Sequence, residues 1–187
     1  MPVHPDVDGV IQHLRINLES ADTISRGLTK QQFNWTPEPG RWSVGQCFEH
    51  LNLIDGQDIG RIGSAIEDGH AKGMKAPGPF RYGFLANKFV NSMDPPITKK
   101  FKAPKNYLPP AETEPDATLK EYRRILNEFL RLAERARGLD LTRIKTGLSG
   151  VPLIKMSLGA RLSLIATHDT RHLWQADQVL KHPSFPR

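Results

Sequence analysis

Residues 157–180 read SLGARLSLIATHDTRHLWQADQVL, and this stretch gives the strongest indication of the fold of the whole chain. Its apolar residues recur at steps of three and four, the spacing that places them on one side of an α-helix. They are Leu158, Leu162, Ile165, Leu173, Ala176, Val179 and Leu180. Ser157 suits the N-cap of this helix, and Pro183 follows its predicted end. A helix with one apolar side needs other helices to cover that side.

Three further segments carry a helical pattern and can supply that cover. They run from about 6 to 27, from 43 to about 68, and from 116 to 137. Ser43 suits the N-cap of the second segment, with Gln46 three residues later in capping-box register. Almost nothing reads as an alternating strand, and residues 147–152 read as an irregular connector. We therefore expect an all-α fold, a four-helix bundle that forms one domain over residues 1–187.

Residues 71–115, between the second and third predicted helices, differ from the rest in composition. Eight of the chain's 15 prolines lie there. A loop of this length inside a compact domain is uncommon, and is usually a lid, a binding loop or a linker. Aromatic and aliphatic residues within 80–90 predict a short apolar helix. We expect this Pro-rich insertion to pack over the bundle, since its apolar residues gain from leaving water.

Composition narrows the class of protein further. With 38% hydrophobic and 25% charged residues, the chain is typical of soluble globular proteins. A single cysteine, Cys47, excludes an intramolecular disulfide and a CxxC site. No run approaches the roughly 18 apolar residues of a membrane span, and no secretory signal is evident, so we expect a cytoplasmic protein with no membrane partner. The net charge of +6 has no single focus beyond residues 99–102 and Lys105, so we expect no nucleic-acid partner.

Three of the seven histidines are placed to meet. His168 and His172 are four residues apart, which puts them on one side of the last helix, one turn above the other. His50, on the second helix, could complete a three-histidine site that leaves coordination positions open, as catalytic zinc sites do. Chance alone supplies about 0.26 such spaced pairs in this composition, so a pair of surface or hydrogen-bonded histidines is the competing interpretation. We expect the other histidines to face solvent: His4, His13, His70 and His182.

Two motifs link these histidines to a known family. Residues 42–51, WSVGQCFEHL, resemble the second-helix signature of the DinB-like superfamily, in particular its YfiT-type metal-dependent hydrolases. Residues 168–175, HDTRHLWQ, resemble the fourth-helix signature of the same family. The resemblance implies a four-helix bundle with one divalent ion, zinc or nickel, held by His50, His168 and His172. It also implies a homodimer.

The family includes transferases that add low-molecular-weight thiols to electrophiles, so the resemblance implies a small-molecule substrate and, for some members, such a thiol. The Pro-rich insertion departs from the shorter members of the family. The substrate therefore cannot be carried over.

Acidic residues near the histidines are candidate catalytic bases or partners of the ligands. Asp55 and Asp58 fall on or beside the apolar stripe of the second helix, where a carboxylate needs a polar pocket or a partner. Asp169 directly follows His168, so it points about 100° away from it and is better placed to pack or to orient another group. We take Asp55, Asp58 and Asp169 as the candidate catalytic residues.

Three other residues have two interpretations each, and a fourth, Gln175, has one. Gln46 either caps its helix or accepts a ligand N–H, and Gln175 is a candidate for the latter role. Arg171 either anchors an anionic substrate or forms a surface salt bridge. Cys47 is a candidate nucleophile, but its position on the apolar side favours a small buried hydrophobe.

The sequence favours a metal-dependent hydrolase or thiol S-transferase acting on a small molecule. Residues 168–172 also resemble the HExxH motif of zinc peptidases, with Asp169 in place of the glutamate. A non-enzymatic, metal-stabilised binding or stress-response module is the third hypothesis.

Overall fold

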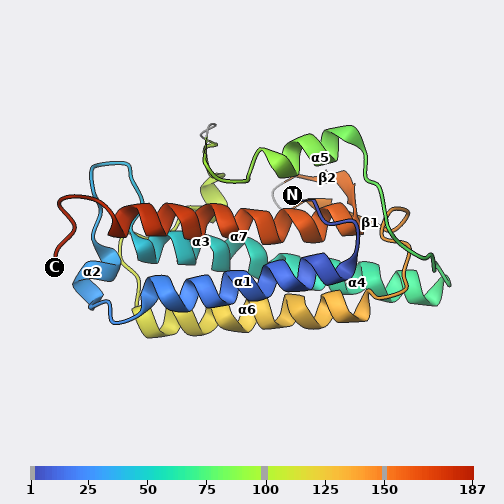
Figure 1. Ribbon diagram of the computed structural model, residues 1–187, viewed down its shortest axis with the longest axis horizontal. Coiled ribbons are helices and arrows are strands. Elements are labelled where there is room, and N and C mark those ends of the chain that lie inside the picture. Colours follow the sequence, from blue (N-terminus) through green and yellow to red (C-terminus); the bar gives the residue numbers. More distant parts are fainter. Residues whose placement is uncertain (1–2, 98–100, 149–150) are drawn as a thin grey trace.

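The computed structural model describes residues 3–97, 101–148 and 151–187. Its helices and strands, labelled in Figure 1, are α1 (Val7–Ser25), α2 (Lys30–Asn34), α3 (Val44–Gly56), α4 (Asp58–Ala71), α5 (Phe84–Asn91), the 3₁₀ turn η1 (Lys105–Tyr107), α6 (Pro115–Arg135), β1 (Lys145–Leu148), β2 (Val151–Ser157) and α7 (Leu158–Leu180). In the described part of the chain, no helix is long and apolar enough to cross a membrane.

The long helices lie along the longest axis of the molecule and pack on one another (Figure 1). Helix α1 contacts α6 and α7, and α3 contacts the same two helices from its own side. Between them lie the largest fully buried side chains, among them Phe48, Tyr122 and Phe129. Burying a side chain of this size contributes about 1.5–3 kcal/mol relative to leaving it in water. The predicted all-α character is confirmed, and the apolar stripes of the sequence are the surfaces that meet.

The helix starts follow the local sequence. The Asp6 carboxylate accepts a hydrogen bond from the Gly9 amide at 2.8 Å and so caps α1. Both halves of the predicted capping box at α3 are present, because Ser43 and Gln46 each accept from the other's backbone amide at 3.1 Å. Ser157 lies at the N-cap of α7 as predicted, although its hydroxyl makes no capping hydrogen bond.

The predicted second helix is two helices, and the expectation of a continuous one was wrong. Helix α3 ends at Gly56, and α4 begins at Asp58. A glycine weakens a helix at this point because it has more backbone freedom to lose. Helix α4 contacts α6, as α3 does. Likewise, residues 30–34 of the first connector form α2, with a capping box of their own.

A two-stranded hairpin precedes α7, where the sequence predicted only an irregular connector. Strands β1 and β2 pair antiparallel, with Thr146 opposite Met156 and both buried. The sequence did not predict this hairpin because Gly147 and Pro152 weaken the strand signal. Residues 149–150 of that connector lie outside the described residues.

The described residues of the Pro-rich insertion contact the bundle. Helix α5, the short apolar helix that the sequence predicted, packs on α7 and lies on the side of it away from α6 (Figure 1). Val90 on α5 and Tyr107 in η1 are buried. Just before α5, the Phe80 amide donates a hydrogen bond to the Pro5 carbonyl at 2.7 Å. The insertion therefore reaches the face of the bundle where α3 and α7 come together.

Candidate metal centre

Three imidazoles meet between α3 and α7. His50 comes from α3, and His168 and His172 come from successive turns of α7. One ring nitrogen of each residue lies within 4.8 Å of the corresponding nitrogens of the other two. The ring centroids of His50 lie 5.4 Å from His168 and 4.6 Å from His172. The packing of α3 on α7 thus brings together residues more than a hundred positions apart, as the spacing and the two motifs predicted.

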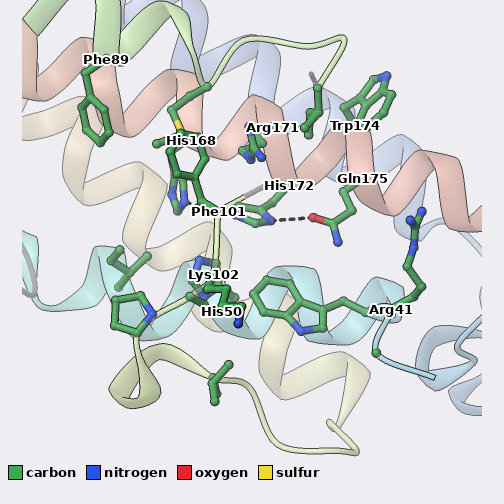
Figure 2. Close-up of a pocket in the computed structure, with 18 residues that line it drawn as sticks. Arg41, His50, Phe89, Phe101, Lys102, His168, Arg171, His172, Trp174 and Gln175 are labelled. Carbon is green, nitrogen blue, oxygen red and sulfur yellow. Dashed lines mark hydrogen bonds between the residues drawn. The ribbon is translucent and has the colours of Figure 1, made fainter. Parts of the chain in front are cut away.

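Hydrogen bonds fix which ring nitrogen faces the centre. The Nδ1–H of His50 donates to the Tyr107 carbonyl at 2.7 Å, and a carbonyl can only accept. The Nδ1–H of His172 donates to Gln175 Oε1 at 3.2 Å, the dashed line in Figure 2. Both rings therefore keep a lone pair on Nε2. This is how proteins orient histidines that bind a metal.

One pair of nitrogens has the spacing that a shared ion requires. His168 Nε2 and His172 Nε2 lie 3.2 Å apart, and two nitrogens bound to one ion at 2.0–2.1 Å, at a tetrahedral angle, would lie about 3.3 Å apart. The donor set, the spacing of this pair and the orientation of His50 and His172 fit a divalent metal ion that favours imidazole.

The electrostatics keep the three rings neutral. Burial, together with the nearby His50, lowers the pKa of His168 to about 3. Burial lowers the pKa of His172 well below its ordinary value and that of His50 in the same direction. A neutral imidazole is the form that binds a metal, so the site needs no deprotonation at neutral pH.

Trp42 covers one side of the histidines. Its ring centroid lies 4.8 Å from that of His50 and 5.5 Å from that of His172, with which it stacks at 28°. Trp42 opens the first family motif, immediately before the N-cap of α3. The motif therefore places an aromatic side chain where it restricts two of the rings.

A cavity of about 770 Å³ opens above the three histidines, and all three line it (Figure 2). This volume lies within the range of small-molecule sites. Aromatic side chains line much of it: Trp42, Phe89, Phe101 and Trp174. Arg41, Lys102 and Arg171 line it as well. Residues of the Pro-rich insertion supply part of its wall, which their composition alone did not indicate.

The predicted acidic residues lie elsewhere in the same helix interface. Asp55, Asp58 and Asp169 are buried, and none of them lines the large cavity as the described residues define it. Asp55 and Asp58 instead line a second cavity of about 160 Å³, which His168 also reaches. Asp58 forms an ion pair with Arg161 of α7. The three candidate bases are thus close to the histidine group but do not line the main cavity.

Asp55 and Asp169 form a pair across the α3–α7 interface. Burial raises the pKa of both carboxyl groups, and the charge of Asp55 raises the pKa of Asp169 further. The two groups therefore lie close to each other near the histidines, although no hydrogen bond reaches the Asp169 carboxylate oxygens from the described residues. Within HDTRH, Asp169 therefore points at Asp55 rather than at the large cavity.

The remaining two-way interpretations are resolved by geometry. Gln46 caps α3, and its amide nitrogen donates to the Pro110 carbonyl at 3.0 Å. Cys47 is buried, and burial raises the pKa of its thiol, so it behaves as a small hydrophobe. Arg171 is only 7% exposed and lies against Phe101, with the guanidinium 5.4 Å from the ring centroid. It is therefore not an exposed surface ion pair.

Three of the four histidines expected to face solvent, His4, His13 and His182, are partly buried. The His182 ring lies against Trp35, with the ring centroids 5.5 Å apart. His4 Nε2 and His13 Nδ1 lie 2.9 Å apart, and His13 Nε2 lies 2.7 Å from the Thr170 hydroxyl on α7. The expectation was wrong because the N-terminal segment folds back over α1 and covers His13. The Tyr107 carbonyl, which orients His50, was also missed. A backbone group 57 residues away leaves no sequence signal.

Fold and site together define a helical protein with a buried three-histidine group at the floor of a cavity. A comparison with protein families matches residues 13–176 to the DinB superfamily. The chain therefore belongs to the DinB superfamily. No curated protein and no solved structure matches the chain.

Proposed function

We propose that this protein is a metal-dependent enzyme, a hydrolase or a thiol S-transferase acting on a small molecule. His50, His168 and His172 would hold one divalent ion, zinc or nickel. The observation that carries the proposal is the convergence of three neutral imidazoles, two of them oriented through Nδ1, at the floor of a cavity. The chemistry such an ion supplies when bound is Lewis acidity, which lowers the pKa of a water molecule or a thiol beside it.

The chain's own residues would bind and orient. Tyr107 and Gln175 hold two ligand rings in one tautomer, and Trp42 excludes water from one side of them. The cavity has room for both a small molecule and a low-molecular-weight thiol, in keeping with the resemblance to thiol transferases.

We assign Asp55, Asp58 and Asp169 a positioning role in place of direct contact with the substrate. Each pairs across an interface with α7 or α3. This arrangement also gives no support to a zinc-peptidase mechanism, which would need Asp169 to face the substrate.

A cytoplasmic location and a homodimer belong to the same proposal. The first is supported by the single cysteine, and the second by the family resemblance.

The test is metal content and reactivity of protein purified without an affinity tag. Wild-type protein and a His70→Ala control, which removes an exposed histidine, should retain about one zinc or nickel per chain. The His168→Ala/His172→Ala variant should retain almost none. The loaded wild-type protein should then convert members of a panel of thiols, electrophiles and hydrolysable esters or amides.

Equal and negligible metal in all three proteins would refute the metal centre. Full metal content with no conversion across the panel would refute the enzymatic proposal and favour the metal-stabilised binding module instead.

A further inference from the structure

Three cationic side chains line the large cavity. Arg41, Lys102 and Arg171 line it, and among the described residues that line it there is no aspartate or glutamate. The acidic residues of the same helix interface line the smaller cavity instead. A cavity lined by one sign of charge, with apolar walls, concentrates ligands of the opposite sign.

The three cations come from separate parts of the chain. Arg41 precedes α3, Lys102 belongs to the Pro-rich insertion, and Arg171 lies on α7 between the two histidines of that helix. A solvated basic face usually follows one helix or one run of sequence, whereas here the fold gathers the charges around one space (Figure 2). Convergence of this kind is expected of a binding site.

The three cationic side chains also differ in how deeply they are buried. Arg41 and Lys102 are exposed and therefore belong to the mouth. Arg171 is buried, donates a hydrogen bond to the Ser92 carbonyl at 3.5 Å, and lies over the Phe101 ring, 5.4 Å from its centroid. These contacts fix the plane of its guanidinium, which suits it to bind two oxygens of one anionic group at once.

Beside the cations lie flat apolar surfaces. Trp42, Phe101 and Trp174 present aromatic rings to the same space. A small inorganic anion would leave most of the 770 Å³ unfilled. The cavity therefore suits a larger molecule with an apolar body and one charged end.

We propose that the substrate of this site is an organic anion. Arg171 would bind its carboxylate, sulfonate or phosphate group, Arg41 and Lys102 would attract it at the mouth, and the aromatic rings would pack on its body. This inference names the substrate class of the enzyme proposed above and rests on that function for the reaction. It makes a claim about binding that is independent of the metal.

A matched pair of fluorescent probes tests it. 1-Anilinonaphthalene-8-sulfonate and N-phenyl-1-naphthylamine share an aromatic body, but only the first carries an anionic group. Both would be titrated into chelator-treated and zinc-loaded protein. In both forms the sulfonate should bind at least about tenfold more tightly than the neutral probe.

Substitutions then assign the preference to Arg171. Arg171→Gln should weaken binding of the sulfonate about tenfold and leave the neutral probe within about twofold, which also reports that the cavity is intact. Arg171→Lys should retain part of the preference. Arg131→Gln, which removes an exposed cation of α6 paired with Glu128, is the control and should change neither.

Equal affinity for the two probes, or a preference that Arg171→Gln does not reduce, would overturn the inference. A sulfonate bound elsewhere on the surface falls in the second case. Since chelator-treated protein is included, loss of the metal centre alone leaves the predicted preference in place, so the two proposals fail separately.

Discussion

Replacing Gln175 by leucine should weaken metal binding without removing a ligand. The Gln175 amide oxygen accepts from His172 Nδ1–H at 3.2 Å, and this bond holds the Nε2 lone pair toward the other histidines. Leucine has a similar size but accepts no hydrogen bond, so the ring loses both its fixed tautomer and its orientation. Partners of this kind contribute about 10- to 100-fold in metal affinity, or about 1.4–2.7 kcal/mol.

The assay is competition between the protein and a chromophoric zinc chelator. Gln178→Leu, one turn further along α7, is the matched control and should leave zinc affinity unchanged, because Gln178 bonds only to Asp177 among the contacts of its side chain that the structure describes. Gln175→Glu should restore affinity, since a carboxylate is a stronger acceptor. A Gln175→Leu affinity within about twofold of wild type would show that this hydrogen bond does not orient a ligand.

Three further predictions concern stability and reactivity. Burial and the charge of His4 lower the pKa of His13 to about 4, so the unfolded state binds more protons than the folded state between pH 6.5 and 4. The free energy of unfolding should therefore fall by about 1–2 kcal/mol over this range, allowing for the partial exposure of His13. Urea unfolding measures this fall, which should be smaller for His13→Gln. A Cβ at Gly45 would lie 2.7 Å from an aromatic carbon of α2, so Gly45→Ala should lower the free energy of unfolding by about 1–3 kcal/mol. A Cβ at Gly60 would meet nothing within 4 Å, so Gly60→Ala should be neutral or stabilising by up to about 1 kcal/mol. Thermal unfolding of both variants measures the difference. Cys47 should resist a thiol-specific disulfide reagent until the protein is denatured, and rapid modification of folded protein would contradict its burial.

Regular helices could be predicted from the sequence because their signals are local. Apolar residues repeated on one side predicted the long helices, and Ser43 with Gln46 predicted the first residue of α3 correctly. The hairpin and the break after Gly56 could not be predicted, since both depend on what the rest of the fold offers as a partner. Short paired strands gain their hydrogen bonds from each other and need little alternation in the sequence.

The candidate site also has parts that the sequence predicted and parts that it did not. The spacing of the histidines on α7 and the two motifs were sufficient to predict that His50 lies close to His168 and His172. The same motifs gave no information on the Tyr107 carbonyl, because any residue offers one. Of the cations that line the cavity, the sequence marked only Arg171 as a candidate anchor for an anion, and it gave no sign that Arg41 and Lys102 would join it. The fold brings them together through the Pro-rich insertion, whose path the sequence does not specify.

X-ray diffraction above and below the zinc and nickel absorption edges, on crystals of protein purified without added metal, tests the three-histidine centre most directly. We predict one anomalous peak per chain, about 2.0–2.3 Å from one nitrogen each of His50, His168 and His172. Three histidines with no peak between them in metal-supplemented crystals, or a peak bound by other residues, would contradict it.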